Sequence, residues 1–223
     1  MDDQEKKQPE RESKPLLEEL PTDPAEIARR EARNGLLQFD RVRALIDEVL
    51  GSKKRFSLRL SIVLELNRIA TEGTNNFPGV FRPHNIRIEG SRHIPPDWRE
   101  VPRLVEEMCD YVNSNRDKSP IHLSAFLMWR TNWIHPFSDG NGRTARAISY
   151  AVLCIQLGFP LPGTKTIPEQ IAADKPPYYH ALEAADRAYD DGKIEVSDIE
   201  ALMGNLLAVQ LLEIHRLATR EQA

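Results

Sequence analysis

A single run of the chain, residues 135–146 with the sequence HPFSDGNGRTAR, holds most of the side chains that could perform chemistry. A loop that opens a helix presents unpaired backbone N–H groups at the positive end of the helix dipole, which suits a phosphate. Gly140 and Gly142 let the backbone approach such a phosphate closely. Arg143 and Arg146 lie three residues apart, so on a helix they point the same way and can hold one polyanion. The run therefore predicts a phosphate-binding loop at the start of a helix.

Asp139 and His135 add two groups that phosphate binding alone does not need. The carboxylate of Asp139 can hold a hard cation such as Mg²⁺, which takes oxygen ligands and usually bridges to phosphates. Asp139 can also cap the helix that follows, and the two roles are compatible. His135, with an unperturbed pKa of about 6.5, is largely neutral at pH 7 and can accept a proton from a hydroxyl. The run thus combines base chemistry with phosphate binding.

Two nearly all-apolar segments flank the run, namely Ile121 to Ile134 and Gly142 to Leu157. Helices that are apolar on almost every face are buried. The polar loop between them is then held by the most rigid part of the core, which suits a site that must keep its geometry.

The rest of the pattern is also mostly helical. Apolar residues at helical spacing predict further helices over Asp23 to Leu50, Leu58 to Thr71, a stretch from Trp98 onward, Pro168 to Asp191 and Val196 to Leu217. In the first of these, Asn34-Gly35 predicts an interruption or a bend. Residues 85–88 alternate between polar and apolar side chains and residues 89–91 can turn the chain, so we expect a short β-hairpin.

The length of the chain is that of one sizeable domain with extensions. The chain has 223 residues, a formal net charge of -4 and a pI near 5.9, a balance that argues against a general nucleic-acid binder. Residues 1–22 are rich in Glu, Lys and Pro, which predicts a disordered charged tail. Cys109 and Cys154 lie in apolar helical contexts without metal-ligand neighbours, so we expect buried free thiols in a reducing compartment.

No secretory or membrane-spanning segment is expected. The opening run MDDQEKKQPERESK is charged and lacks the apolar region of a signal peptide. The longest apolar stretch, Ala145 to Phe159, contains polar residues and is too short to span a bilayer. We therefore expect a soluble, cytoplasmic protein without a membrane partner.

The run from His135 to Arg146 resembles the signature of the Fic family. That signature reads His-Pro-Phe, any residue, Asp or Glu, Gly-Asn, Gly or Lys, Arg, any two residues, Arg, and every specified position is met. The resemblance extends to LNRIATEGTNNFPGVFRPHNIRIEG, which looks like the family's helix and flap, and to YYHALEAAD at residues 178–186. It covers roughly Arg55 to Asp191, and so most of the chain outside the charged tail.

The resemblance implies an all-α fold, a Fic-type helical bundle with a short β-hairpin flap. Residues 23–51 would be an N-terminal helical extension, residues 52–191 the Fic core, and residues 192–223 a C-terminal helix packed on the core. The implied activity is protein adenylylation, in which AMP passes from the co-substrate ATP to a Ser, Thr or Tyr hydroxyl of a target protein.

The resemblance also implies a role for each position of the signature. His135 would be the general base, Asp139 would hold Mg²⁺ against the α- and β-phosphates, and Phe137 would anchor the loop in the core. The nucleotide-binding residues would be Gly140, Asn141 and Gly142 in the anion-binding loop and Arg143 and Arg146 on the β- and γ-phosphates.

Two features outside the signature would complete the site. The flap, around Ile86 to Ile94, would hold the target protein by main-chain pairing. Tyr178 and Tyr179 would line the adenine pocket, although ordinary helix packing explains both equally well.

Many Fic proteins also carry an inhibitory helix, in which a Glu pairs with the second arginine of the signature. Its pattern, Ser or Thr, any three residues, Glu, then Gly or Asn, has no proper match here. Glu31, on the N-terminal extension, is a degenerate candidate that would pair with Arg146. A separate inhibitory partner is the alternative, and a homodimer contact through the C-terminal helix is a minority reading.

Two other functions are compatible with these residues. One is a different transfer on the same scaffold, such as another nucleotidyl group, phosphorylation or removal of AMP; Gly142 in place of Lys counts against phosphorylation. The other is a regulatory module that binds a nucleotide or a partner without turnover. The presence of His135 argues against that module, because binding alone needs no base.

Overall fold

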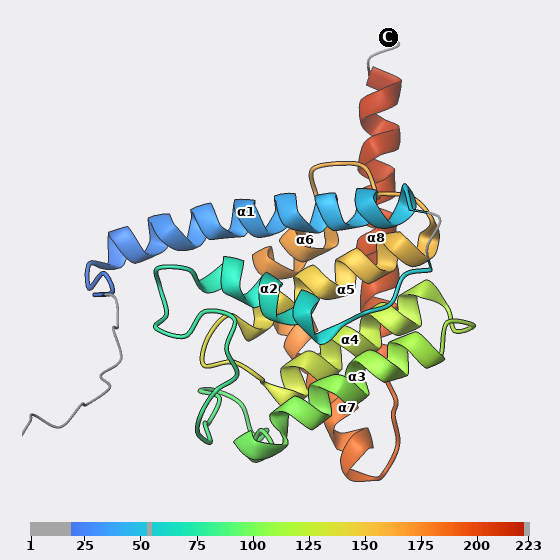
Figure 1. The fold of residues 1–223 in the computed structure, drawn as a ribbon. Coiled ribbons are helices and arrows are strands. Elements are labelled where there is room, and N and C mark those ends of the chain that lie inside the picture. The colour runs from blue at the N-terminus through green and yellow to red at the C-terminus, as the bar shows by residue number, and fades with distance from the viewer. Residues whose placement is uncertain (1–18, 53–54, 221–223) are drawn as a thin grey trace, which may run out of the picture.

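The chain folds as a bundle of helices (Figure 1). The structure, a computed structural model, describes residues 19–52 and 55–220, with side chains as far as Glu213. The helices are α1 (Pro24–Leu50), α2 (Leu60–Thr71), the 3₁₀ helix η1 (Trp98–Glu100), α3 (Val101–Ser114), α4 (Pro120–Ile134), α5 (Asn141–Leu157), α6 (Ile167–Ala173), α7 (Pro176–Asp190) and α8 (Ser197–Arg220). The expected all-α class is confirmed. Most of the predicted tail lies outside the described residues.

The two helices that flank the phosphate-loop run form the centre of the bundle. α4 and α5 contact each other more extensively than any other pair of helices. α4 begins where the Ser119 hydroxyl accepts a hydrogen bond from the backbone N–H of His122 at 3.0 Å, with Pro120 at its first position. Apolar side chains cover nearly every face of α4, and most of them are at most 2% exposed, among them Leu123, Phe126, Leu127, Trp129 and Ile134. The loop between these helices is therefore anchored in the core at both ends.

α1 lies across one side of the bundle, against α2 and α5 (Figure 1). The predicted bend at Asn34-Gly35 is wrong, because α1 continues through these residues as one helix. The buried Asn34 side chain donates to the carbonyl oxygen of Glu72 at 2.8 Å instead of stabilising a turn. One turn later the buried Gln38 donates to the carbonyl oxygen of Leu66 at 2.9 Å. These two bonds fix α1 on α2.

The segment between α2 and η1 is irregular. Its one extended pairing in the described residues is an isolated antiparallel bridge between Phe81 and Phe137. The predicted β-hairpin is not confirmed: residues 85–94 form no paired strands, although a turn lies at the expected place. There the N–H of Ser91 donates to the carbonyl oxygen of Ile88 at 3.2 Å, around Gly90 with φ 75°. The turn that the sequence predicts is therefore present, but the two strands on either side of it are not.

The C-terminal third consists of α6, α7 and α8. The stretch predicted as helical from Pro168 to Asp191 is two helices, because the chain extends at Asp174 before Pro176 starts α7. α8 packs on α4, α6 and α7, and its C-terminal end projects beyond the bundle (Figure 1). Val209, Leu211 and Leu212 are exposed on α8. The homodimer contact expected on this helix stays a prediction.

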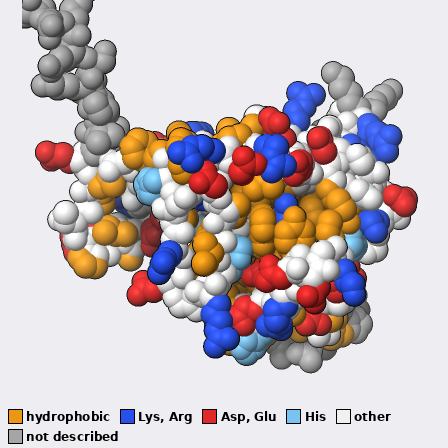
Figure 2. Space-filling view, turned by 90° about the horizontal axis from the view of Figure 1, so that it is seen from below, with side chains coloured by type: hydrophobic (Ala, Val, Ile, Leu, Met, Phe, Trp, Pro, Cys, Tyr) orange, Lys and Arg blue, Asp and Glu red, His pale blue; other side chains and the backbone are white. Residues whose placement is uncertain are grey.

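Three further sequence expectations concern thiols, membranes and surface charge. Cys109 and Cys154 are buried and free, as predicted. None of the helices in the described part of the chain is long and apolar enough to cross a membrane. On the side of the molecule away from α1, basic and acidic side chains are interspersed around a group of hydrophobic ones (Figure 2).

Candidate active site

A cleft of about 520 Å³ opens where the loop after α4 meets the flap turn and α7. It is lined by Ile88, Glu89, Gly90, Ser91, His93, Asn132, Trp133, His135, Ser138, Asp139, Gly140, Asn141, Gly142, Arg143, Arg146, Lys175, Tyr178, Tyr179, Leu182, Glu183 and Asp186. All nine site residues predicted from the sequence are therefore brought together. The flap contributes the turn at residues 88–91, so a segment remote in sequence faces the phosphate loop.

His135 ends α4 in a left-handed backbone conformation, with φ 49° and ψ 60°. Among the described residues no other non-glycine residue has a positive φ, and such strain is typical of functional sites. Its ring Nδ1 lies 3.3 Å from the carbonyl oxygen of Asn132. A neutral imidazole that donates from Nδ1 keeps its lone pair on Nε2. Burial lowers the pKa of His135 to about 4, so the ring is neutral at pH 7 and able to accept a proton.

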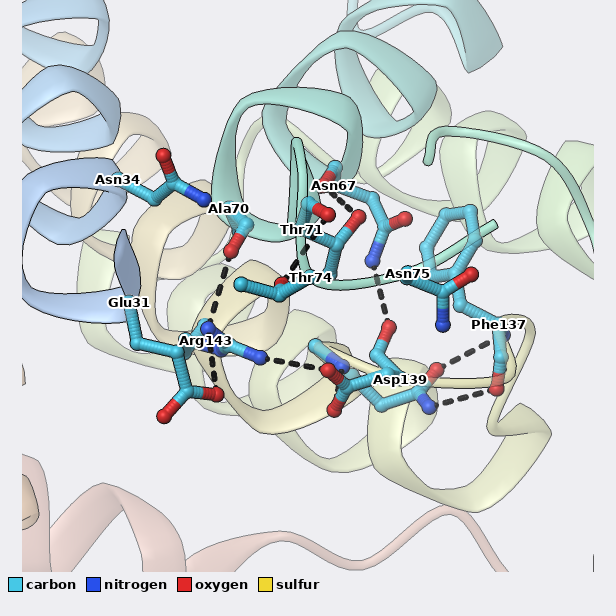
Figure 3. Close-up of polar contacts among 12 residues, drawn as sticks. Glu31, Asn34, Asn67, Ala70, Thr71, Thr74, Asn75, Phe137, Asp139 and Arg143 are labelled. Atoms are coloured by element: carbon cyan, nitrogen blue, oxygen red, sulfur yellow. Dashed lines mark hydrogen bonds and ion pairs between the residues drawn. The ribbon is translucent and has the colours of Figure 1, made fainter. Parts of the chain in front are cut away.

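Asn141 fixes the turn between the two central helices. Its side-chain oxygen accepts from the N–H of Phe137 at 2.9 Å, and its side-chain nitrogen donates to the carbonyl oxygen of Phe137 at 2.8 Å (Figure 3). Phe137 is 1% exposed and its ring lies against Phe81, with 5.8 Å between the centroids. Phe137 thus occupies the core position expected of an anchor. Both polar atoms of the Asn141 side chain are used in this turn. Only its backbone N–H, at the start of α5, can therefore bind an anion.

The start of α5 is open to an anion. Asn141, Gly142 and Arg143 are the first three residues of the helix, and their N–H groups have no acceptor within it. Gly140 precedes them with φ 77°, and a Cβ on it would lie 2.6 Å from Cγ2 of Thr71. Glycine is therefore required at residue 140 by both its conformation and the close approach of α2.

Asn67, on α2, is a positioning residue that the sequence reasoning missed. It is 1% exposed, and its side-chain nitrogen donates to the carbonyl oxygen of Asp139 at 2.9 Å (Figure 3). Its side-chain oxygen accepts from the N–H of Gly79 at 3.0 Å. The sequence did hold a signal for it: Asn67 is a polar residue one helical turn from Val63 on one side and from Ala70 on the other, and both of these are buried.

Asp139 presents one carboxylate to the cleft. Its Oδ1 accepts from the N–H of Gly140 at 2.6 Å and its Oδ2 from Nη2 of Arg143 at 2.9 Å, while 46% of the side chain remains exposed. The described residues contain no cluster of three or more His, Cys, Asp or Glu side chains for a metal ion. Mg²⁺ is commonly held by one or two carboxylates together with phosphates and water. The donor set at Asp139 fits that mode and not a metal cage built of side chains alone.

The two arginines of the loop have different surroundings. Arg143 donates from Nη1 to the carbonyl oxygen of Ala70 at 3.0 Å, and the same atom lies 3.3 Å from Oε1 of Glu31 (Figure 3). The predicted pair of Glu31 with Arg146 is thus not the one observed, because α1 places the Glu31 carboxylate beside Arg143. Arg146 has no hydrogen bond or ion pair with any described residue, and burial lowers its pKa. Arg146 is therefore the loop cation that is available to a ligand.

Tyr178 and Tyr179 lie in the first turn of α7 and line the cleft. Tyr178 is 2% exposed and its hydroxyl accepts from the side-chain nitrogen of Asn132 at 2.7 Å. Tyr179 is 50% exposed, with its ring centroid 5.7 Å from that of Tyr178. Asn132 also offers its carbonyl oxygen to His135, so one residue links the tyrosine wall to the base. Tyr179 is the aromatic ring free to contact a ligand.

Comparison with known proteins gives this geometry a family. Residues 57–153 match the Fic/DOC family. The protein adenylyltransferase Fic of Drosophila willistoni is 30% identical over 155 residues, which is 68% of this chain and 29% of that protein. The namesake of Drosophila virilis is also 30% identical over 68% of this chain and 30% of its own length. The chain thus spans less than a third of the length of these relatives.

Solved structures agree on the fold. A Fic-domain signalling protein from Bacteroides thetaiotaomicron superposes with a TM-score of 0.65 at 20% identity, over 86% of this chain and 72% of that one. A Fic family protein from Desulfovibrio desulfuricans gives a TM-score of 0.64 at 20% identity, over 89% of this chain and 56% of that one. With the sequence match over the central helices and the helical arrangement in agreement, this chain belongs to the Fic/DOC family.

Proposed function

We propose that the chain is a protein adenylyltransferase, which moves AMP from ATP to a Ser, Thr or Tyr hydroxyl of a target protein. The observation that carries the proposal is the meeting of His135, neutral and buried, with the open start of α5 in one cleft. A base and a phosphate-binding loop in one cleft suit hydroxyl attack on a phosphate, where positioning and charge stabilisation do most of the work. The names of the Drosophila relatives support AMP as the transferred group.

Several residues of the loop have a task in this proposal. His135 accepts the hydroxyl proton on Nε2 as that oxygen bonds to the α-phosphorus of ATP, and pyrophosphate leaves with the electrons of the bond that breaks. The backbone N–H groups of Gly142 and its neighbours bind the phosphates, with Arg146 as the free cation beside them. Asp139 would hold Mg²⁺, which supplies charge neutralisation on the phosphates when bound.

Substrate selection would use the other walls of the cleft. Tyr179 and the edge of Tyr178 would contact the adenine base, which stacks on aromatic rings. The flap from Ile86 to Ile94 would dock the target protein. Its backbone pairs with no strand in the described residues. Apart from the turn bond from Ser91 to Ile88 and the bond from the His93 N–H to the Ser91 hydroxyl, its N–H and C=O groups would be available to an extended target segment. Such recognition is mostly main-chain, which makes it tolerant of target sequence.

We also propose that Glu31 restrains ATP binding. Its carboxylate lies beside Arg143, where a phosphate group of ATP would arrive, and the two anions would compete for that guanidinium. A separate inhibitory partner remains the alternative source of restraint.

Labelled ATP tests the proposed activity directly. The full chain is incubated with Mg²⁺ and ATP labelled at the α or the γ position, and label on the protein itself is measured in wild type, His135→Ala and Asp139→Asn. Adenylylation predicts α label that survives denaturation and is lost in both variants. His180→Ala is the matched control, because His180 is exposed on α7 and does not line the cleft. It should label like wild type.

Each other result points elsewhere. Label from the γ position means phosphorylation, and label that persists in His135→Ala means that another group is the base. If ATP binds but no label appears from any nucleotide, with the protein itself as the acceptor or with added cell extract, the chain is a binding module.

A further inference from the structure

Arg82 is the largest buried charge near the cleft, and the catalytic proposal has given it no role. Arg82 is 1% exposed, and it forms no ion pair with any described residue. Burial lowers the pKa of its guanidinium, and the carboxylate of Asp97, which forms no ion pair with it, only partly opposes this effect. A buried charge of this kind is costly unless its donors are satisfied, so the identity of its acceptors is informative.

Three consecutive carbonyl groups at the end of α4 accept hydrogen bonds from Arg82. The backbone N–H of Arg82 donates to the carbonyl oxygen of Pro136 at 2.9 Å. Its Nε donates to the carbonyl oxygen of His135 at 2.8 Å, and its Nη2 lies 3.4 Å from that of Ile134. The last carbonyl groups of a helix lack partners inside it and carry the negative end of the dipole, so a guanidinium there is well placed.

These bonds surround the strained residue. His135 adopts φ 49°, a conformation that non-glycine residues avoid, and it does so between two carbonyl groups that Arg82 holds on either side. A planar guanidinium donates along several fixed directions and can hold several carbonyl oxygens at once, whereas an ammonium group is a point donor. His135 lines the cleft, so its left-handed conformation bears directly on where the imidazole lies.

The same guanidinium also holds both ends of the flap. Nη1 donates to the carbonyl oxygen of His84 at 3.0 Å and Nη2 to that of Pro96 at 2.5 Å. Residues 84 and 96 bracket the flap segment that faces the cleft. One side chain therefore connects the backbone of the base with both roots of the segment proposed to dock the target.

We propose that Arg82 is a positioning residue: its guanidinium sets the left-handed turn at His135 and ties the flap to that turn, so that base and target segment keep one geometry. The expected effect of Arg82 on the reaction rate rests on the proposed adenylyl transfer. The geometry at His135 is open to measurement without any activity.

The test compares wild type with Arg82→Lys and Arg82→Met, with Arg103→Met as control. Arg103 is an exposed arginine on α3 whose partners are Glu100 and Glu107. Nitrogen-detected NMR of the imidazole reads His135 directly. We expect one ring species with the proton on Nδ1 in wild type and in Arg103→Met. We expect a shifted or mixed set of signals in both Arg82 variants, including Arg82→Lys, which keeps the charge.

Kinetics provide the second reading. Because misplacement of a reacting group by about 1 Å can cost roughly 100-fold, kcat for α-label transfer should fall by about that factor in Arg82→Lys. The KM for ATP should change little, since the phosphate loop is held by Asn67 and Asn141. Unchanged His135 signals and an unchanged kcat in Arg82→Lys overturn the inference. An inactive wild type with the expected NMR change overturns the proposed function and leaves the positioning role intact.

Should both Arg82 variants fail to fold, the contact can be tested from its other side. Glycine accepts a positive φ and valine resists it, so His135→Gly should leave the Arg82 Nε–H signal as slow to exchange as in wild type, and His135→Val should shift it or speed its exchange. Identical Arg82 signals in these two variants would overturn the inference.

Discussion

The carboxylate of Glu31 lies 3.3 Å from Nη1 of Arg143, and the same guanidinium lies 2.9 Å from the carboxylate of Asp139. α1, α5 and the phosphate loop are therefore joined by one arginine, while Arg146 is without such a partner among the described residues. The restraint proposed for Glu31 would therefore act through the first arginine of the loop. A ligand phosphate at Arg143 has to displace or share the place of Glu31.

Replacement of Glu31 by Gln should tighten ATP binding. The change removes the competing charge and keeps the shape, so we expect up to about a tenfold gain in affinity, equivalent to about 1.4 kcal/mol, and stronger autolabelling. The Glu31 side chain is 44% exposed, so the ion pair adds at most about 1 kcal/mol to the free energy of unfolding and the melting temperature should move little.

Calorimetric titration with ATP measures the affinity. Glu48→Gln is the control, because Glu48 forms an ion pair of the same length with Arg41 on α1. Equal ATP affinities in the two variants and wild type would dismiss Glu31 as a restraint.

The pairing could not be foreseen from sequence because it depends on where α1 lies. The sequence located Glu31 on a helix and the arginines on another, but a helix that bent at Asn34-Gly35 would have presented Glu31 elsewhere. The straight course of α1 is set by Asn34 and Gln38, whose buried amides reach carbonyl groups of α2. Side-chain bonds to a distant backbone leave no periodic signal in a single sequence.

Elements with strong local signals were predicted well. The central helices were visible because continuous apolar runs end at turn residues, and Gly158 ends α5 with φ 83°, as glycine commonly does. The flap was harder. Residues 85–94 have the alternation of a hairpin, yet their roots are held by Arg82 and not by cross-strand pairs. No local pattern marks Arg82 as buried, since its burial follows only from tertiary packing.

The low pKa of His135 predicts how activity and stability respond to acid. Burial lowers this pKa to about 4, so His135 should stay neutral, and competent as a base, well below pH 6. In the unfolded chain its pKa is about 6.5, so protonation favours unfolding as the pH falls. The stability that comes from burying the neutral ring is complete above about pH 6.5 and is lost between about pH 6.5 and 4.

NMR titration and denaturant unfolding between pH 4 and 7 check this expectation. Wild type should lose stability over that interval more steeply than His135→Gln, in which residue 135 does not titrate. A midpoint for His135 near 6.5 in the folded protein would contradict the expected burial.

Asn67 should matter for ATP binding more than for the base. Asn67→Ala leaves the N–H of Gly79 and the carbonyl oxygen of Asp139 without their partner, at a cost of about 1–3 kcal/mol for a buried unpaired group. Asp139 and the start of α5 would then shift, so we expect a higher KM for ATP and weaker Mg²⁺ dependence, with the His135 ring signals unchanged.

Asn113→Ala is the matched control. Asn113 bonds both backbone groups of Leu58, each at 2.8 Å, and does not line the cleft. It should lower stability and leave KM unaltered; an equal effect on KM would mean that general loosening is responsible.

Gly140→Ala separates conformational strain from steric contact at the phosphate loop. An alanine at residue 140 must adopt φ 77° and place its Cβ 2.6 Å from Cγ2 of Thr71. Gly192 has φ 79°, and a Cβ on it would meet nothing within 4 Å, so Gly192→Ala reports the strain alone, about 1–2 kcal/mol. Gly140→Ala should cost that amount plus about 1–3 kcal/mol for the clash, and should weaken ATP binding as well.

The excess cost of Gly140→Ala should be relieved by removing the methyl group that it strikes. Thr71→Ser deletes Cγ2 and keeps the hydroxyl that donates to the carbonyl oxygen of Asn67 at 2.9 Å. In the double variant we expect the free energy of unfolding to recover toward that of Gly192→Ala, and ATP affinity to return in part. Urea unfolding and calorimetric titration measure the two quantities. If Thr71→Ser recovers nothing, the methyl group of Thr71 is not what the new Cβ strikes, and the clash lies with the side-chain nitrogen of Asn67, 3.0 Å from that Cβ. If stability returns without ATP affinity, the small size of Gly140 serves the phosphate itself and not only the packing of α2.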